Sequence, residues 1–237
     1  MALMPSVEHV KQAVEQHALR IPVGAAMLDA DLNLPDAPGG LVLFAHGSGS
    51  SRFSPRNRRV ARALNAAGLA TVLADLLTPD EERVDERTRQ LRFDIGLLAL
   101  RLAGLTDWLR TSGPMHLDIG YFGASTGAGA ALVAAAQRPE SVGAVVSRGG
   151  RPDLAGAALE RVTAPTLLIV GGNDKVVIDL NRQAFASLRS EKHMEIVPGA
   201  THLFEEPGAL ETVSSLARDW FLRHFEARRR SANQAHP

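Results

Sequence analysis

The segment Gly123-Ala124-Ser125-Thr126-Gly127 has the G-x-S-x-G pattern of an activated serine nucleophile. An apolar run, residues 117–122, precedes it and an alanine-rich stretch follows it, so the pattern predicts a strand, a sharp turn and a helix. Such a turn holds the serine side chain out at the carboxyl end of the strand. The helix N-terminus places backbone N–H groups and a positive dipole end beside it. We therefore expect Ser125 to be a nucleophile.

A nucleotide-binding loop is the rival interpretation, because Gly123, Gly127 and Gly129 have the G-x-x-x-G-x-G spacing of short-chain dehydrogenases. That loop belongs to the first βα unit of such enzymes, whereas these glycines fall near the middle of the chain. Such enzymes also need a Tyr-x-x-x-Lys sequence downstream, and the single tyrosine, Tyr121, lies upstream. The nucleophile interpretation is favoured.

An acid and a base for Ser125 are expected later in the chain, in the order Ser, Asp, His. Asp174 follows the apolar run 165–170, and His202 follows the run 193–197. Each position is a predicted strand end, and the carboxyl ends of parallel strands meet at one edge of the sheet, where ligands bind. Taken alone, Asp174 is typical of a turn and His202 of a protein surface. Their order and placement relative to Ser125 predict a catalytic triad.

The glycine- and serine-rich segment 46–51 follows the apolar run 41–45 and is expected to be the oxyanion loop. The backbone N–H groups of Ser48 and Thr126 would then bind the negative oxygen of a tetrahedral intermediate. A phosphate-binding loop is disfavoured because Arg52 occupies the position of the third glycine of that motif, and no Walker A sequence occurs. His46 is expected to pin this loop rather than to act as a base.

Three arginines lie near the expected site: Arg52 and Arg56 follow the oxyanion loop, and Arg148 follows the apolar run 142–147. Guanidinium groups bind carboxylates in a bidentate manner, so these residues are expected to hold an anionic part of a substrate. The alternative is that they are exposed or paired with surface carboxylates, and the sequence leaves it open.

Short apolar runs alternate with amphipathic stretches along the chain, which is typical of βαβ units and predicts a doubly wound, mostly parallel sheet. Apolar residues at steps of three and four from Leu91 to Leu109 predict one long helix, and Thr78 to Glu81 resembles a helix start with a capping box. Strands are expected as an antiparallel pair within residues 21–34 and at 41–45, 70–74, 117–122, 142–147, 165–170 and 193–197.

One α/β domain is expected over residues 21–226. Residues 1–20 are expected to form a loosely ordered N-terminal arm, and residues 227–237 a frayed C-terminal tail. Residues 148–162 leave room for about one short helix between two strands, so we expect little or no lid over the site.

The 237-residue chain has 26 basic and 26 acidic residues, so its charge gives no reason to expect nucleic acid or an anionic membrane as a partner. The chain has no cysteine, which excludes disulfides and thiolate zinc sites, and it has no paired-histidine metal motif. Neither a metal nor another cofactor is expected.

The first residues lack the features of a signal peptide and no apolar run is long enough to span a membrane, so a cytoplasmic location is expected.

Several motifs together resemble those of the dienelactone-hydrolase-like branch of small bacterial α/β hydrolases: HGSGSSRFSPRN, DLLTPDEE, GASTG, GGND and GATHLFEEP. The resemblance covers roughly residues 21–225 and implies the α/β-hydrolase fold, with Ser125, Asp174 and His202 matching the family's triad. Dienelactone hydrolases use a cysteine nucleophile, and this chain has Ser125 at that position.

The resemblance and the triad imply a carboxylesterase-type serine hydrolase that cleaves small soluble acyl esters through an acyl-enzyme, with a small-molecule acyl substrate as its partner. A thioesterase, peptidase or acyltransferase would use the same residues. A non-catalytic binding protein with this fold would be marked by a broken triad, which the sequence does not have. The natural substrate and the oligomeric state stay open.

Overall fold

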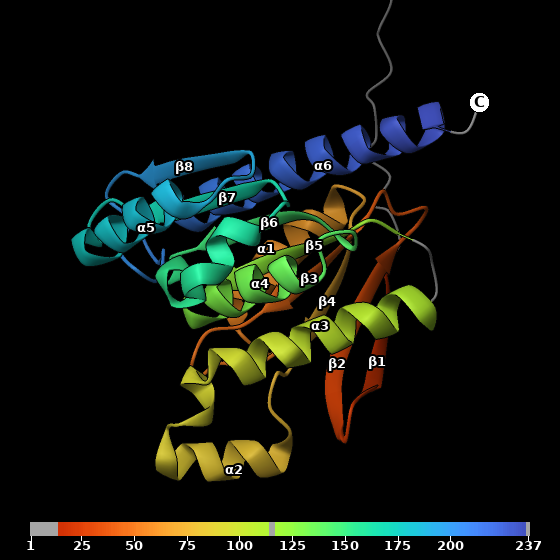
Figure 1. Ribbon diagram of the computed structural model, residues 1–237, viewed down its shortest axis with the longest axis horizontal. Helices are drawn as coiled ribbons and strands as arrows, with labels where there is room; N and C mark the ends of the chain where they lie inside the picture. Colours follow the sequence, from red (N-terminus) through yellow and green to blue (C-terminus); the bar gives the residue numbers. More distant parts are fainter. Residues whose placement is uncertain (1–13, 114–116, 236–237) are drawn as a thin grey trace, which may run out of the picture.

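The computed structural model describes residues 14–113 and 117–235, which contain one eight-stranded sheet in the order β1-β2-β4-β3-β5-β6-β7-β8 (Figure 1). Strands β3 to β8 are parallel to one another, and β1 and β2 add an antiparallel edge. The predicted doubly wound, mostly parallel sheet is confirmed. The strands are β1 (Val14–Val23), β2 (Ala26–Pro35), β3 (Leu41–Ala45), β4 (Ala70–Ala74), β5 (Ile119–Ala124), β6 (Val142–Arg148), β7 (Thr166–Gly171) and β8 (Lys192–Val197).

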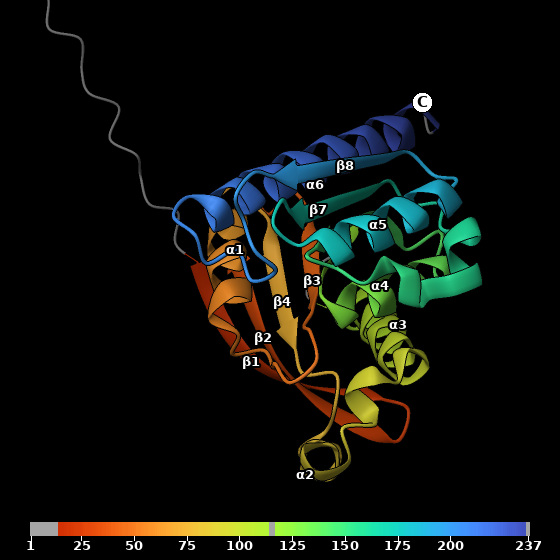
Figure 2. The same ribbon diagram turned by 90° about the vertical axis from the view of Figure 1, so that its left-hand side faces the viewer.

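Helices cover both faces of the sheet, with α1 and α6 on one face and α3, α4 and α5 on the other (Figure 2). α2 projects from the body at the edge where β4 ends. The helices are α1 (Pro55–Ala66), α2 (Pro79–Thr88), η1 (Leu91–Phe93), α3 (Ile95–Thr111), α4 (Thr126–Gln137), η2 (Pro152–Arg161), α5 (Lys175–Ser187) and α6 (Ala209–Ala235). Within the described ranges, none of the helices combines the length and the apolar composition that crossing a membrane would need.

The central strands are apolar because helices cover both of their faces. Every residue of β3, β4, β5, β6 and β7 is buried. A strand buried on both faces has a continuous apolar run rather than an alternating pattern, and those runs predicted each of these strands to within two residues at either end. The carboxyl ends of the central strands therefore converge on one edge of the sheet, as the predicted site requires.

The N-terminal prediction was wrong for residues 14–20, which belong to β1 rather than to a loosely ordered arm. β1 pairs with β2 along its whole length, through a turn that contains Gly24 at φ +58°. Most residues in the first half of β1 are exposed, so this edge strand is polar and has no apolar run to reveal it. Residues 1–13 of the predicted arm lie outside the described ranges.

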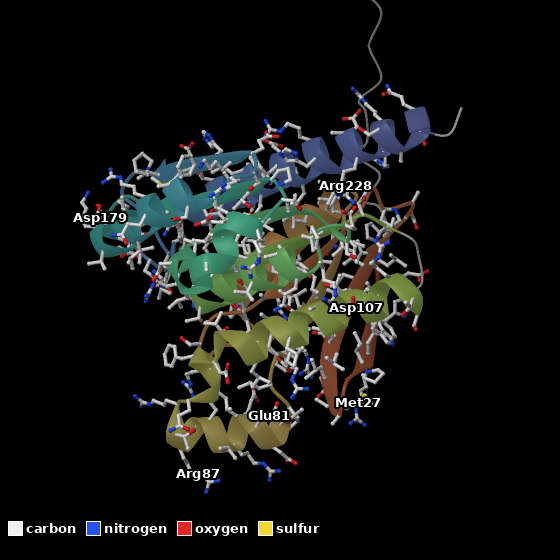
Figure 3. All side chains as sticks on the ribbon, in the orientation of Figure 1. Met27, Glu81, Arg87, Asp107, Asp179 and Arg228 are labelled. Atoms are coloured by element: carbon white, nitrogen blue, oxygen red, sulfur yellow. The ribbon has the colours of Figure 1, made fainter. Side chains whose placement is uncertain are left out.

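The predicted frayed tail is also wrong for residues 227–235, because α6 continues to Ala235. Arg228, labelled in Figure 3, anchors this part of the helix to the body. Its Nε donates to Asp118 Oδ1 at 3.0 Å and its Nη2 donates to the carbonyl oxygen of Glu140 at 3.0 Å. A run of arginines typical of a solvated terminus thus includes a residue that holds the helix end in place.

The long helix predicted from Leu91 begins later than expected, because Leu91 lies in η1 and α3 starts at Ile95. Asp94 ends the first segment and caps the second, since its Oδ1 accepts the N–H of Leu97 at 2.9 Å. The capping box predicted at Thr78 is confirmed at the start of α2. Figure 3 shows Glu81 and Arg87 at opposite ends of α2, and Glu81 binds Arg101 of α3 at 2.6 Å.

Candidate active site

Ser125 lies on the turn between β5 and α4, as the sequence predicted, and it has an uncommon positive φ of +51°. Positive φ is strained for a residue with a side chain, so the surrounding packing must impose it. Gly127 supplies part of that packing, because a Cβ atom there would collide with the carbonyl oxygens of Ala45 and His46. The neighbouring strand also takes part, since the Ser125 N–H donates to the carbonyl oxygen of Arg148 at 3.3 Å.

Asp174 and His202 meet at the same edge of the sheet. Asp174 follows β7 and begins α5, and its Oδ2 lies 2.7 Å from Nδ1 of His202. The Asp174 side chain is 16% exposed and that of His202 is 38% exposed, so the pair is partly shielded while the imidazole stays accessible. A carboxylate at Nδ1 favours the tautomer with the proton on Nδ1, which leaves Nε2 free to accept a proton.

The segment that carries His202, residues 198–208, is called here the histidine loop. Its backbone carbonyl groups hold it against the end of β7: that of Ala200 accepts the N–H of Asn173 at 2.9 Å, and that of Gly199 accepts from the side-chain Nδ2 of Asn173 at 2.8 Å. Gly149, directly after the residue that binds the Ser125 N–H, packs beneath His202. A Cβ atom at Gly149 would lie 3.7 Å from His202 Cε1 and 2.9 Å from the His202 carbonyl oxygen.

The three predicted triad residues are thus gathered at one edge of the sheet, but not all are hydrogen-bonded. Across residues 14–113 and 117–235, no hydrogen bond links Ser125 Oγ with His202. Catalytic hydrogen bonds are often long in ligand-free enzymes and shorten when substrate binds. The geometry therefore joins the predicted acid to the predicted base, at the edge of the sheet that also carries Ser125.

The oxyanion loop lies where the sequence placed it, between β3 and α1. Ser48 and Thr126, the two predicted oxyanion donors, are in direct contact, because the Ser48 N–H donates to Thr126 Oγ1 at 2.9 Å. The predicted backbone donor at Ser48 therefore already has a protein acceptor. Thr126 is the first residue of α4, where the backbone N–H groups have no partner within the helix.

His46, at the start of the oxyanion loop, is buried and pins it as expected. Its Nε2 accepts the backbone N–H of Leu76 at 3.2 Å, so the proton lies on Nδ1, which donates to the Gly47 carbonyl oxygen at 3.0 Å. This pattern needs a neutral imidazole. Burial lowers the pKa of His46 below its ordinary value, which favours the same neutral form.

Arg52, directly after the oxyanion loop, is surrounded by carboxylates rather than free to meet a ligand. Its backbone N–H donates to Asp75 Oδ1 at 2.7 Å, and its guanidinium also binds Asp75 Oδ2. Asp31 and Asp29 lie 3.6 and 3.9 Å from the same guanidinium. Sequence reasoning missed Asp75, although its position directly after the buried strand β4 was an available signal.

The other two predicted substrate-binding arginines differ in their partners. Arg56 pairs with the exposed Glu205 at 2.9 Å. Arg148 is buried, and within the described residues no carboxylate lies within ion-pair distance of it; its Nη2 donates to Asn57 Oδ1 at 3.2 Å. Burial, with a smaller contribution from the like charge of Arg56, lowers the pKa of Arg148 to about 10.

A cavity of about 340 Å³ lies against the oxyanion loop, between this loop and α2. Its wall on the α2 side is acidic and includes Glu82 and Glu86. Burial and the nearby charges of Asp75 and Glu86 raise the pKa of Glu82.

A larger hollow of about 1300 Å³ lies between the β1–β2 hairpin and α1, and none of the predicted site residues lines it. Over the described ranges, no cluster of three His, Cys, Asp or Glu residues is arranged to hold a metal.

Comparison with known proteins finds solved structures with the same fold as this chain and a family whose profile matches its sequence. The profile of the dienelactone hydrolase family matches residues 28–227. A crystal structure of dienelactone hydrolase from Anabaena variabilis is 60% identical, and the match covers 89% of this chain and 98% of that one with a TM-score of 0.88. Est1E from Butyrivibrio proteoclasticus is 17% identical over 88% of this chain and 99% of its own, with a TM-score of 0.73, which shows a shared fold.

Two curated proteins of Mycobacterium tuberculosis, both named "Putative phosphoribosyl transferase", are 58% identical to this chain over 208 residues. The match covers 87% of this chain and 46% of each relative, so the chain spans about half the length of the curated relatives it matches. The family profile covers most of the chain, and the resemblance stated from the motifs is confirmed. The chain belongs to the dienelactone hydrolase family and has the α/β-hydrolase fold.

Proposed function

We propose that the protein is a serine hydrolase that cleaves small soluble acyl esters through an acyl-enzyme. Ser125 is the nucleophile, His202 the base and Asp174 the residue that orients the base. The observation that carries this proposal is the 2.7 Å contact between Asp174 Oδ2 and His202 Nδ1 at the edge of the sheet where Ser125 is held at positive φ.

The roles follow from the protonation states. His202 Nε2 takes the proton of the Ser125 hydroxyl as its oxygen bonds to the acyl carbon, and the carbonyl oxygen becomes an oxyanion. The same proton then passes from His202 to the leaving alcohol as the bond between the acyl carbon and that alcohol breaks. Water repeats both steps on the acyl-enzyme, which releases the acid and restores Ser125.

A small soluble substrate is supported by the short connection between β6 and β7, where η2 is the one helix and no large lid domain is inserted. We therefore expect short-chain soluble esters to react faster than emulsified long-chain lipids. The cavity of about 340 Å³ beside the oxyanion loop is not lined by Ser125, Asp174 or His202 and does not set the size of the substrate. Thioester, amide and acyl-transfer reactions are the alternatives on the same triad.

The arginines expected to hold an anionic group are not equivalent candidates. Arg52 and Arg56 are paired with carboxylates, which weighs against a role in binding an anion. The buried Arg148 has no such partner among the described residues and remains the candidate. The transferase name of the Mycobacterium tuberculosis relatives is not carried over, because more than half of their length lies outside the match.

An electrophilic fluorophosphonate tests the proposal, because a serine activated by histidine reacts far faster than a surface hydroxyl. We expect one labelled residue, Ser125, no label in Ser125→Ala and much slower labelling in His202→Ala. Turnover of short esters should fall on the order of 10⁴-fold in Asp174→Asn, where the histidine tautomer is no longer fixed. A folded protein that takes no label would overturn the proposal in favour of a non-catalytic binding protein.

A panel of matched ester, thioester and amide substrates then tests the bond type. The ester should show the largest kcat/KM relative to its uncatalysed hydrolysis. A larger acceleration for the thioester or the amide would replace the esterase assignment while leaving the triad in place.

A further inference from the structure

The contact between Ser48 and Thr126 changes how the oxyanion hole can work. An amide N–H has one proton, and that of Ser48 points at Thr126 Oγ1 from 2.9 Å. A substrate oxygen cannot take this proton while the contact lasts. Either the threonine side chain rotates away when substrate binds, or the hydroxyl itself faces the oxyanion. The two cases make opposite predictions about the threonine hydroxyl.

The surroundings of Thr126 favour a hydroxyl that stays in place. Thr126 is buried, and χ1 of a β-branched side chain is stiff. The first turn of α4 also packs closely on the base of the oxyanion loop, because a Cβ atom at Gly127 would collide with the carbonyl oxygens of Ala45 and His46. Because this packing fixes the backbone of Thr126, rotation of its side chain would give up the contact that joins the start of α4 to the oxyanion loop.

The hydroxyl of Thr126 has an unused proton. It accepts the Ser48 N–H, and no acceptor for its own O–H exists among residues 14–113 and 117–235. Accepting one hydrogen bond polarises a hydroxyl and strengthens the bond that it donates. The Thr126 hydroxyl lies one residue after the nucleophile, and its oxygen already accepts a hydrogen bond while its proton has no acceptor among the described residues. Such a hydroxyl is suited to donate to developing negative charge.

On the basis of the proposed function, we infer that the Thr126 hydroxyl is itself an oxyanion donor and that Ser48 acts through it. In the first step, Ser125 Oγ bonds to the acyl carbon, the carbonyl π electrons move to oxygen, and the serine proton passes to His202 Nε2. The oxyanion then accepts hydrogen bonds from the Thr126 N–H and the Thr126 O–H. Thr126 keeps its proton throughout, so the step needs no further reactant.

Thr126→Val tests this inference, because valine keeps the shape and the backbone N–H but removes the hydroxyl. Loss of one oxyanion donor lowers kcat by about 10²–10³-fold in a comparable enzyme, and we expect a loss in that range with KM nearly unchanged. Thr126→Ser, which keeps the hydroxyl, should stay within about tenfold of the wild type. The readout is steady-state kinetics on one short ester, with the melting temperature as a measure of folding.

A Thr126→Val variant as active as the wild type, or more active, would overturn the inference, since it would mean that the hydroxyl only blocks the Ser48 N–H. Thr126→Ala adds no new atoms and repeats the test if valine lowers the melting temperature strongly, with the same loss expected. Failure of the inference is distinguishable from failure of the proposed function. The first leaves a wild type that labels at Ser125 and turns over, and the second leaves neither property.

Discussion

The oxyanion loop and the histidine loop approach Ser125 from strands on opposite sides of β5, and they are held in different ways. Side chains fix the oxyanion loop: His46 binds Leu76 at its start, and Arg52 binds Asp75 just after its end. The histidine loop is held through its backbone carbonyl groups, by hydrogen bonds from the uncharged Asn173 and by close contacts with β7. The first loop should therefore respond to protonation and to changes of charge, and the second to changes of volume.

The largest effect should come from added volume beneath the histidine loop. In Gly171→Ala the new Cβ atom would lie 2.5 Å from the Ala200 carbonyl oxygen and 2.6 Å from that of Thr201. Backbone cannot yield as a flexible side chain does, so the loop must shift. A displacement near 1 Å at a catalytic group can cost about 10²-fold, and we expect kcat to fall by about that factor.

Gly199→Ala is the matched control for this prediction, because Gly199 lies on the histidine loop itself and a Cβ atom there would have free space. Nothing lies within 4 Å of the position that its new Cβ atom would take, and the residue has φ +74°. The backbone strain should cost about 1–2 kcal/mol of unfolding free energy, measured by urea denaturation, with kcat close to the wild-type value. Equal losses of kcat in both variants would contradict the inference that close packing on Gly171 positions the histidine loop.

An intermediate effect should follow from breaking the ion pair beside the oxyanion loop. Arg52→Met leaves Asp75, whose side chain is 11% exposed, without its cation and near Asp29 and Asp31. Removing one partner of a buried pair costs about 3–5 kcal/mol, and because Arg52 is 20% exposed we expect a loss near the lower end of that range. Urea denaturation measures it.

Arg56→Met is the control, since it removes the same charge from a pair whose carboxylate, Glu205, is 62% exposed. Exposed pairs contribute less than about 1 kcal/mol, and the unfolding free energy should change by no more than that. Equal unfolding free energies for the two variants would contradict the prediction that the Arg52–Asp75 pair stabilises the fold more than the Arg56–Glu205 pair does.

The smallest effect should be the acid sensitivity that His46 gives the oxyanion loop. Its pKa in the folded protein is lowered, so below the unfolded value near 6.5 the unfolded chain binds a proton before the folded one does. This contribution to stability is complete above pH 6.5 and is lost as the pH falls toward the lowered pKa, by at most about 1.4 kcal/mol per pH unit.

His46→Gln removes this titration and should flatten the fall of unfolding free energy between pH 6.5 and 5, measured by denaturation at several pH values. Part of the slope should remain, because burial also lowers the pKa of His224, which titrates with the same sign. If the slope were unchanged in His46→Gln, protonation of His46 would not contribute to the dependence of stability on pH.

The sequence predicted those parts of the molecule that depend on local pattern. Buried parallel strands have continuous apolar runs, so β3 to β7 were found. The half-exposed β8 and an antiparallel pair at the sheet edge were also expected, and strand ends then located Ser125, Asp174 and His202. The helix start at Thr78 followed from capping chemistry, and its side chain accepts the backbone N–H of Glu81. Each of these signals is contained within a few neighbouring residues.

The features that escaped prediction depend on tertiary contacts. The surroundings of Arg52 combine carboxylates from β2 and from the end of β4, and no spacing along the chain brings these together. The contact of the Ser48 N–H with Thr126 Oγ1 spans two separate turns. Residues 14–20 of β1 were missed because the exposed part of an edge strand has no apolar run, and the break at Asp94 was missed because apolar periodicity continues across it.

The two edges of the sheet have a consequence for how the chain avoids aggregation. β1 and β8 end the sheet, and an edge strand with open backbone groups can pair with the edge of another molecule. Both carry charged and imidazole side chains that are exposed or half-buried, among them Glu15, His17 and Arg20 on β1 and Lys192, His193 and Glu195 on β8. Pairing of such an edge with the edge of another molecule would bury these charges without partners. The two polar edge strands therefore oppose aggregation of the sheet through its edges.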